Sequence, residues 1–426
     1  MHRANKGWES TFQTSARSSK TFVASLRSIV KIILDSDNVF EYLNNLNYCQ
    51  IADRENIEVT LIPAKNFNLL LTFSDGRTLL VKQENRNYCG QTKGEFWAAW
   101  QMQKLMLSFP DFGDRTRHFL PELIYFDPTN SILIVNYFAD YCDLYRYYAD
   151  ENQFPTEIAI AIGKLLASIH SQTFDREQYQ EFLTRSVPNR EIDLEPSYVD
   201  DPIRRLSRIT PDIFAMIPIE CHQFFKLYQR FPSLTQAIAD LRQSIAPSCL
   251  IHNDLKLNNL LLDLQWQQPG SQMIKLIDWE RAAWGDPAFD LGCLLGSYLE
   301  IWLDGMAISN TLSINESLQL ATTPLELLQP SIGALVEAYL DSFPEIIAAR
   351  IDYLDRAIQF TGLALIQRIE INIDETRTFG NRGIMMLQIA KQLLCDPKAS
   401  INILFGTNFD RSKYDVIYQS TSRNSR

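Results

Sequence analysis

Two aspartates and one asparagine stand at a spacing that suits phosphoryl transfer. The run from Ile251 to Leu262 places Asp254 and Asn259 five residues apart at the start of a predicted strand. Another aspartate, Asp278, follows nineteen residues after Asn259, in the sequence Ile-Asp-Trp-Glu. Phosphoryl transfer needs a group that orients the attacking hydroxyl and hard oxygen ligands that hold Mg²⁺ on the phosphates. These three residues supply that set.

The same residues also have plainer interpretations. Taken singly, each aspartate would suit a solvated turn or the end of a strand, but the pair at this spacing favours a site. His252 stands two residues before Asp254, and a histidine there more often has a structural role than the role of a base. We therefore expect the two aspartates to carry the chemistry.

An upstream lysine adds to the pattern. The predicted strand that ends in Leu-Leu-Val-Lys carries Lys82 on an otherwise apolar edge. Burying an ammonium group is costly unless it meets phosphates or a carboxylate. Glu95, thirteen residues further on, lies in the first turn of the next predicted helix and is a plausible partner. The alternative is a surface lysine and an unrelated glutamate at a helix start.

Hydrophobic periodicity predicts the elements that would position these residues. A helix is predicted over residues 20–48, and a second one over 94–107. Five strands are predicted, with Asp75-Gly76 as a hairpin turn, over residues 57–61, 68–73, 78–82, 122–126 and 132–137. From about residue 140 the pattern is helical almost to the end, apart from a strand pair at 259–264 and 273–278.

Three motifs in this order resemble the aminoglycoside phosphotransferase and choline kinase superfamily. They are His-x-Asp-x4-Asn from His252, Asp-Trp-Glu from Asp278, and Gly-Asp-Pro-Ala-Phe-Asp ending at Asp290. The resemblance covers roughly residues 57–380. It implies an α+β, two-lobed, protein-kinase-like fold with a small β-rich N-lobe and a mainly helical C-lobe. The nucleotide would lie between the lobes, beside a hinge near residue 138.

The resemblance also implies roles for individual residues. Asp254 would be the catalytic residue that accepts the proton of the substrate hydroxyl. Asn259 and Asp278 would bind Mg²⁺, and His252 and Asp290 would brace the loops. The nucleotide, ATP, would be held by Asn68, Lys82, Glu95, Asn136 and Phe138.

The phosphate-covering turn departs from the family pattern. Where the family usually has a glycine pair before an asparagine, this chain has Pro-Ala-Lys-Asn-Phe-Asn over residues 63–68. Without glycine, close approach of the backbone to phosphates would need Asn66 or Asn68 in the left-handed conformation.

We expect four parts in the chain. They are an N-terminal extension with an amphipathic helix (1–56), the N-lobe (57–138), the C-lobe (139–400) and a C-terminal tail (401–426). The first 31 residues hold six Lys or Arg and one acidic residue, Glu9, so a transit peptide is the alternative to a partly disordered tail.

Composition excludes several functional classes. The chain of 426 residues carries a net charge of −11, which argues against nucleic acid or an anionic membrane as a partner. No apolar run is long enough to span a bilayer, and the seven cysteines are scattered, which favours a reducing, cytoplasmic compartment.

Several other patterns have structural interpretations. Asp111-Phe112-Gly113 spells a magnesium motif but stands before the catalytic loop, so we expect a turn. His170 is expected to pack at a helix end, and Gly292 and Gly296 to allow close helix packing. Aromatic residues after Asp278 could box a quaternary ammonium group but are more often core: Trp279, Trp284, Tyr298 and Trp302. An acidic run over 191–201 is expected to be a solvated loop.

The leading hypothesis is an ATP-dependent kinase of a small molecule. About eighty residues separate His170 from His252, and no Ala-Pro-Glu segment follows Asp278, so a small hydroxyl-bearing acceptor is favoured over a protein substrate. A pseudokinase that serves as a binding or scaffold module is the alternative, because the phosphate turn lacks glycine. A protein kinase is a third, remote option.

Overall fold

The computed structural model describes residues 31–184, 206, 211, 217–307, 311–407 and 409–414. A five-stranded antiparallel sheet forms the small lobe, with the strand order β1-β2-β3-β5-β4. Its strands are β1 (Ile57–Leu61), β2 (Phe67–Phe73), β3 (Thr78–Gln83), β4 (Leu123–Asp127) and β5 (Ile132–Asn136). The hairpin predicted at Asp75-Gly76 joins β2 to β3, with Gly76 in the left-handed conformation (φ 85°) that its lack of a Cβ permits. All five predicted strands are therefore confirmed to within one residue at every end.

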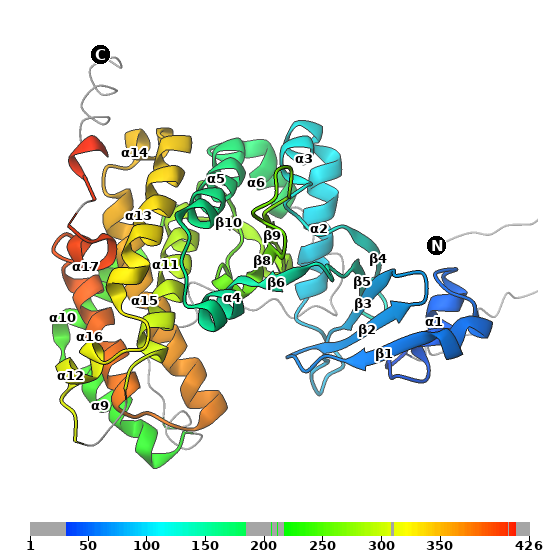
Figure 1. Ribbon diagram of the computed structural model, residues 1–426, viewed down its shortest axis with the longest axis horizontal. Helices are drawn as coiled ribbons and strands as arrows, with labels where there is room; N and C mark the ends of the chain where they lie inside the picture. The colour runs from blue at the N-terminus through cyan, green and yellow to red at the C-terminus, as the bar shows by residue number, and fades with distance from the viewer. Residues whose placement is uncertain are drawn as a thin grey trace, which may run out of the picture.

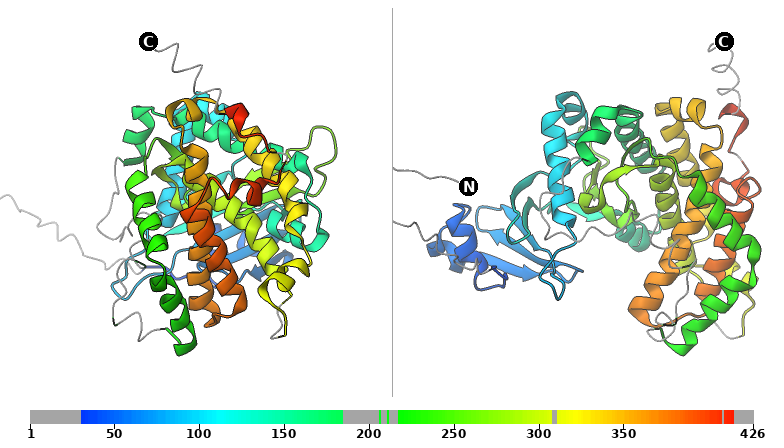
Figure 2. Two further views of the ribbon diagram at one scale, coloured as in Figure 1. Left: turned by 90° about the vertical axis from the view of Figure 1, so that its left-hand side faces the viewer. Right: turned by 180° about the vertical axis from the view of Figure 1, so that it is seen from behind.

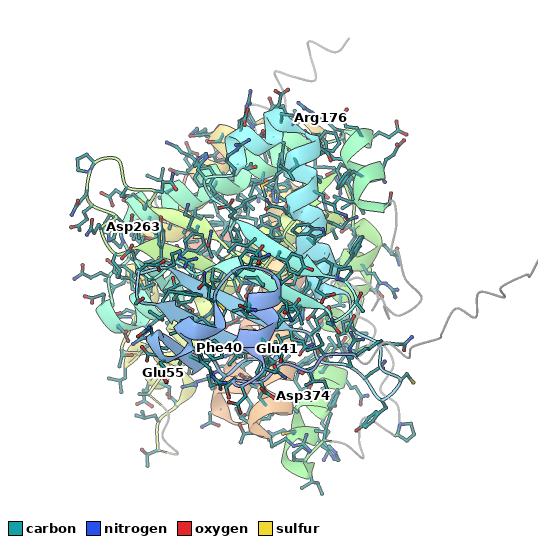
Figure 3. The ribbon with its side chains drawn as sticks, turned by 90° about the vertical axis from the view of Figure 1, so that its right-hand side faces the viewer. Phe40, Glu41, Glu55, Arg176, Asp263 and Asp374 are labelled. Atoms are coloured by element: carbon teal, nitrogen blue, oxygen red, sulfur yellow. The ribbon has the colours of Figure 1, made fainter. Side chains whose placement is uncertain are left out.

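Alternation along the strands gives the sheet two apolar faces. On β5, Ile132 and Ile134 point to one core, while Leu133 and Val135 point to another. The first face is covered by α1 (Val39–Asn45), and the second by α2 (Glu95–Ser108). The small lobe is thus a sheet between two helices (Figure 1). Figure 3, which views the molecule from the side of this lobe, shows Phe40 and Glu41 of α1 in front of the strands.

The helix predicted over residues 20–48 is wrong for much of its length. Residues 31–35 have no regular secondary structure, and α1 is shorter than predicted. Residues up to 30, where the prediction begins, lie outside the described ones. The cause is tertiary: the Ile32 amide donates to Asn130 Oδ1 at 2.9 Å, and the Leu34 amide donates to Gln83 Oε1 at 2.8 Å. These bonds to the ends of the sheet replace the local bonds of a helix.

The rest of the chain is mainly helical, as predicted. The first of these helices are α3 (Pro110–Thr116), α4 (Leu144–Glu151), α5 (Thr156–Thr173) and α6 (Glu177–Thr184). Further helices are α9 (His222–Arg230), α10 (Pro232–Ser244), α11 (Pro287–Asp304), α12 (Ile314–Gln319), α13 (Leu325–Ser342), α14 (Glu345–Ala349), α15 (Tyr353–Thr376), α16 (Asn381–Cys395) and α17 (Ile401–Phe405). Several of these pack side by side in one large core (Figure 2).

Two small sheets lie within the helical lobe. The predicted strand pair is present as β8 (Leu260–Asp263) and β9 (Ile274–Leu276), with β6 (Tyr141–Asp143) added at its edge. A second pair joins β7 (Cys249–Ile251) to β10 (Ala283–Gly285). Because β7 ends where the run from His252 begins, and β9 ends just before Asp278, these strands bring the two motifs together.

Close packing of α11 on α15 confirms the prediction for two glycines. A Cβ at Gly292 would collide with Phe360 Cβ and lie 2.7 Å from the carbonyl oxygen of Ala357. A Cβ at Gly296 would lie 2.9 Å from Ala364 Cβ. Glycine at both positions lets the backbones approach.

Asp111-Phe112-Gly113 is not the turn that we predicted. It lies in α3, with Phe112 fully buried and with Gly113 against the backbone of Met106 on α2. The proline at the first helical position explains the start of the helix, since its fixed φ suits that place.

Two further findings concern the cysteines and the question of a membrane-spanning helix. All seven cysteines are free thiols. Within the described ranges, none of the helices combines the length and the apolar character that a membrane crossing requires.

Candidate active site

A cleft of about 550 Å³ lies between the two lobes. Its walls include Leu80, Lys82 and Val135 from the sheet, and the segment Asn136–Phe138 that leaves β5. The floor includes Asp278 and Glu280 from the loop after β9. The lobes therefore enclose a space lined by apolar side chains of the sheet and by charged side chains, both from the loop after β9 and from α4.

One buried carboxylate organises the run that contains Asp254. Asp290, in the first turn of α11, accepts the amide of His252 at 2.7 Å and the amide of Asn253 at 2.9 Å. His170 Nε2 lies 3.3 Å from the same carboxylate, and His170 Nδ1 lies 2.9 Å from the hydroxyl of Tyr339. Asp290 and His170 are both fully buried, so His170 packs between elements as predicted.

His252 connects this loop to the loop of Asp278. Its Nε2 lies 2.7 Å from the carbonyl oxygen of Ile277. Because a carbonyl oxygen only accepts, Nε2 carries the proton. The ring also packs on Trp279, with centroids 4.8 Å apart. His252 is buried and stands between the two loops.

Asp254 and Asn259 are held to each other through the backbone. Asn259 Nδ2 donates to the Asp254 carbonyl oxygen at 2.7 Å, which fixes the turn between them. Asn253, just before Asp254, takes the left-handed conformation (φ 64°), which is uncommon for a residue with a side chain. The Asp254 carboxylate is one-fifth exposed, and Lys256 Nζ lies 3.3 Å from it.

Lys82 crosses the cleft to the loop after β9. Its Nζ lies 3.1 Å from Asp278 Oδ1 and is bonded to Glu280 Oε1. Burial lowers the pKa of Lys82, but the two carboxylates raise it further, so the net direction is upward. Lys82 therefore stays protonated, and it joins the lobes.

The two carboxylates respond differently to this lysine. Burial raises the pKa of Asp278, but Lys82 lowers it more, and the net direction is downward. Burial raises the pKa of Glu280 to about 7, against the attraction of Lys82 and with repulsion from Asp278. Asp278 is thus the ionised member of the pair, and its left-handed backbone (φ 60°) turns the loop at this point.

The predicted pair of Lys82 with Glu95 is wrong. Glu95 is instead bonded to Lys65, with Asn66 Nδ2 at 3.4 Å and Arg281 Nη2 at 3.9 Å. Lys65 and Asn66 come from the turn between β1 and β2. A lysine in that turn thus takes the partner that we had expected for Lys82, and Glu280 takes its place beside Lys82.

The turn between β1 and β2 lacks the left-handed asparagine that we expected for a phosphate-binding turn without glycine. Neither Asn66 nor Asn68 has a positive φ angle. Asn68 lies in β2 directly opposite Lys82 and is buried, and among the described atoms its Oδ1 has no hydrogen-bond partner. The side chain therefore offers one unused acceptor near Lys82.

The segment after β5 carries the two remaining predicted residues. Asn136 is exposed, with Nδ2 3.4 Å from Glu122 Oε2, and the amide of the next residue, Tyr137, donates to the Thr78 carbonyl oxygen at 3.1 Å. The Phe138 ring lies 5.4 Å from that of Tyr141, and Lys275 Nζ lies 5.3 Å from the Phe138 ring centroid. This segment thus contacts both lobes.

Sequence reasoning gave no role to three charged residues beside the predicted ones. They are Lys65, Lys256 and Glu280. Glu280 and Lys256 each stand two residues from a predicted site residue, so proximity in the motif could have indicated them. For Lys65 the sequence offered only its place in the atypical turn.

The aromatic residues after Asp278 belong to the core. Trp279 and Tyr298 are buried, and Tyr298 Oη lies 3.2 Å from the hydroxyl of Tyr148. Trp302 is buried as well, and Trp284 packs against the same core. The structural interpretation of these residues is confirmed. The acidic run over 191–201 lies outside the described residues.

At this site, side-chain oxygens of Asn259 and Asp278 are the candidate ligands for a metal ion. Among the residues that the structure describes, no three His, Cys, Asp or Glu side chains gather as a metal site. Asn259 and Asp278 would therefore form a two-residue set that phosphate oxygens complete, as is usual for Mg²⁺.

Comparison with known proteins supports the same reading of the chain. Residues 142–316 match the family described as "Phosphotransferase enzyme family". This match contains the motifs of Asp254, Asn259, Asp278 and Asp290. No curated protein matches the sequence significantly.

Solved structures show a distant likeness. A choline kinase from Cryptosporidium parvum is 15% identical, with a TM-score of 0.48, and the alignment covers 87% of this chain and 97% of that one. An ethanolamine kinase from Plasmodium vivax is 13% identical, with a TM-score of 0.46, and the alignment covers 85% of this chain and 88% of that one. Choline kinase LicA from Streptococcus pneumoniae is 16% identical, with a TM-score of 0.41, and the alignment covers 83% of this chain and 99% of that one. At this distance, the two-lobed kinase-like fold rests on the chain's own sheet and helices.

Proposed function

We propose, because residues 142–316 match the model of the phosphotransferase enzyme family, that this protein transfers the γ-phosphoryl group of ATP to a hydroxyl group of a small molecule. One observation carries the proposal. Asp254 and Asn259, joined through the Asp254 carbonyl, stand on one loop, and the Asp278 loop is tied to it by His252 and to the sheet by Lys82. The chemistry of phosphoryl transfer needs little else from a protein.

In the proposed reaction, Asp254 orients the acceptor hydroxyl and takes its proton. The hydroxyl oxygen forms a bond to the γ-phosphorus, and the bond from that phosphorus to the β,γ-bridging oxygen breaks. ADP leaves with the electron pair. Lys256, at 3.3 Å from the Asp254 carboxylate, adds a positive charge next to the transferred group.

The residues present fit a magnesium ion. Asn259 commits its Nδ2 to the backbone, so its amide oxygen is the atom left to a cation, and Asp278 is ionised. Carboxylate and amide oxygens are hard ligands of the kind that Mg²⁺ takes. When bound, the ion would neutralise charge on the β- and γ-phosphates. These two residues would hold it.

The cleft would hold the rest of the nucleotide. Its apolar walls, which include Leu80 and Val135, suit a planar base, and the backbone of residues 136–138 offers polar groups at the edge. Lys82 would position the α- and β-phosphates. Lys65 would compensate for the missing glycines if its ammonium turned from Glu95 to the phosphates.

A binding module without catalysis is the second candidate. The observation that favours it is the closure of the turn between β1 and β2 on Glu95 through Lys65 and Asn66. In that state the turn does not offer backbone amides to phosphates. ATP binding without turnover in the presence of every acceptor would support this candidate.

The proposed role of Asp254 is tested by Asp254→Asn, which keeps the size of the side chain and removes the base. We expect ATP affinity to stay within about threefold, while kcat falls by about 10² to 10⁴, the range of general base catalysis. Asp240→Asn, at an exposed site on α10, is the matched control. Unchanged turnover in the Asp254 variant would show that the assigned role is wrong. The acceptor class and a cytoplasmic location remain predictions.

A further inference from the structure

A polar face of α11 leads outward from the catalytic loop. The Leu257 amide, three residues after Asp254, donates to Ser297 Oγ at 3.0 Å. Glu300 and Asp304 follow Ser297 at three and seven residues, so they lie about one and two turns further along the same side of the helix. A molecule whose hydroxyl reached Asp254 would extend along this face.

Charges of both signs meet along this face. Glu300 Oε2 lies 3.4 Å from Arg368 Nε on α15. Asp304 Oδ1 lies 3.2 Å from Arg382 Nη1 at the start of α16, and the Tyr145 hydroxyl donates to Asp304 at 2.6 Å. With Asp254 and Lys256, three carboxylates face three cationic groups from four elements.

The pair nearest the catalytic loop is half-buried and electrostatically connected to it. The side chain of Glu300 is 20% exposed, and that of Arg368 is 37% exposed. Burial raises the pKa of Glu300 to about 7, while Arg368 and Lys256 lower it. The same Lys256 lies 3.3 Å from the Asp254 carboxylate. Glu300 and Arg368 therefore belong to the surroundings of the proposed base.

The balance of charge selects the kind of molecule that this face can bind. A molecule with only a positive charge that paired with Glu300 would leave the half-buried Arg368 without its partner. A molecule with only a negative charge would do the same to Glu300. Of the two, Glu300, with its side chain only 20% exposed, loses most if it is left without a counter-charge. A molecule with both charges can pair with both groups at once.

We propose that the phosphoryl acceptor is a small hydroxylated zwitterion of the amino-acid kind. Its ammonium group pairs with Glu300, its carboxylate takes the planar fork of Arg368, and its hydroxyl reaches Asp254. The inference rests on the proposed function and names the acceptor class for that same site. Nothing in it requires a change in the nucleotide cleft.

A purely structural role is the competing explanation for the same ion pair. In that role the ion pair would hold α11 against α15, but the backbones of these helices are already closely packed at Gly292 and Gly296. Partly exposed pairs contribute little to stability. The two explanations differ in what they predict for substrate selectivity, and that is the quantity to measure.

The test compares each hydroxylated amino acid with molecules that lack one charge. L-Serine is compared with ethanolamine and 3-hydroxypropanoate, and L-homoserine with 3-aminopropan-1-ol and 4-hydroxybutanoate. L-Threonine is compared with 1-aminopropan-2-ol and 3-hydroxybutanoate. Magnesium-dependent ADP release and calorimetric binding are measured for each, with the full chain and MgATP or a non-hydrolysable analogue. We expect kcat/KM for at least one amino acid to exceed that of both its counterparts by tenfold or more.

Two variants assign this selectivity to residues. Arg368→Gln should remove the preference over the amine, because the carboxylate then has no partner. Glu300→Gln should remove the preference over the hydroxy acid. Arg411→Gln is the control, since it breaks a similarly half-buried pair with Asp355, in the first turn of α15, and should leave selectivity unchanged. In all three variants, MgATP affinity should stay as in the parent.

Three outcomes would overturn the inference. Equal use of amine and amino acid is one, and selectivity that survives in Arg368→Gln is another. Failure of every amino acid to bind, while MgATP still binds, is the third, and it leaves the proposed function intact. Loss of MgATP binding itself would instead count against the proposed function.

Discussion

At the scale of residues, the candidate site depends on one carboxylate that does no chemistry. Asp290 takes two consecutive backbone amides, those of His252 and Asn253, just before Asp254. Two charge-assisted bonds to adjacent amides fix the direction of the chain at that point. The left-handed backbone of Asn253 (φ 64°) then turns the chain immediately before Asp254. The position of the proposed base thus follows from Asp290.

Glu300 gives a prediction of pH dependence. Its pKa is raised from the usual 4.5 to about 7, mainly by burial. The folded protein therefore binds this proton more tightly than the unfolded chain, and stability falls as pH rises from about 4.5 to about 7. The Glu300→Gln variant lacks this loss. The difference in free energy of unfolding between the variant and the parent should therefore shift by about 3 kcal/mol in favour of the variant as the pH rises through that range.

Chemical denaturation at a series of pH values measures this difference. Glu345→Gln, at an exposed position on α14, is the control and should follow the parent at every pH. A constant difference between Glu300→Gln and the parent from pH 4.5 to 8 would contradict the assignment of the raised pKa to Glu300.

From the sequence, candidate site residues were easier to select than the contacts that they make. Asp254, Asn259 and Asp278 could be selected because hydroxyl activation and magnesium binding restrict the residue types and their spacing. The partner of Lys82 could not, because Glu95 and Glu280 are both acidic and both close to the cleft. Which of them reaches Lys82 depends on the turn between β1 and β2, whose Lys65 binds Glu95.

At the scale of elements, periodicity was sufficient where local signals were strong. The five strands of the small lobe alternate clearly and are separated by turn residues. Strands β6, β7 and β10 were missed because each has three residues, too few for a pattern. The helix predicted before residue 39 failed because Asn130 and Gln83, far away in sequence, bind that segment.

The contact between α11 and α15 gives a prediction at this scale. Gly292→Ala would bring a methyl group against Phe360 and the carbonyl oxygen of Ala357. We expect it to lower the free energy of unfolding by about 2 kcal/mol, the usual cost of overpacking. Gly333→Ala is the control on α13, since the nearest atom to its Cβ would be 4.0 Å away.

Both variants gain helix propensity, so the difference between them isolates packing. Gly333→Ala should be neutral or slightly stabilising. Equal stability of the two variants in a urea titration would mean that α11 and α15 tolerate an extra methyl group and that Gly292 is not needed for their packing.

At the scale of the whole molecule, the cleft is charged across its opening. Lys82 on the sheet meets Asp278 and Glu280, and Arg281 Nη2 lies 3.9 Å from Glu95 on α2. The two lobes are thus joined by ion pairs at the proposed phosphate end of the cleft. Binding of MgATP would exchange these contacts for contacts to phosphate and metal.

The central claim is that Asp278 and Lys82 hold a magnesium nucleotide between the lobes. It is tested most directly by calorimetric titration of ATP into the full chain with Mg²⁺ and with EDTA, for the parent and for Asp278→Asn. Asp263→Asn, on β8 and outside the cleft lining, is the control. We predict that Mg²⁺ tightens ATP binding at least tenfold in the parent and in the control but not in Asp278→Asn. No ATP binding by the parent, or an unchanged magnesium effect in Asp278→Asn, would contradict this account.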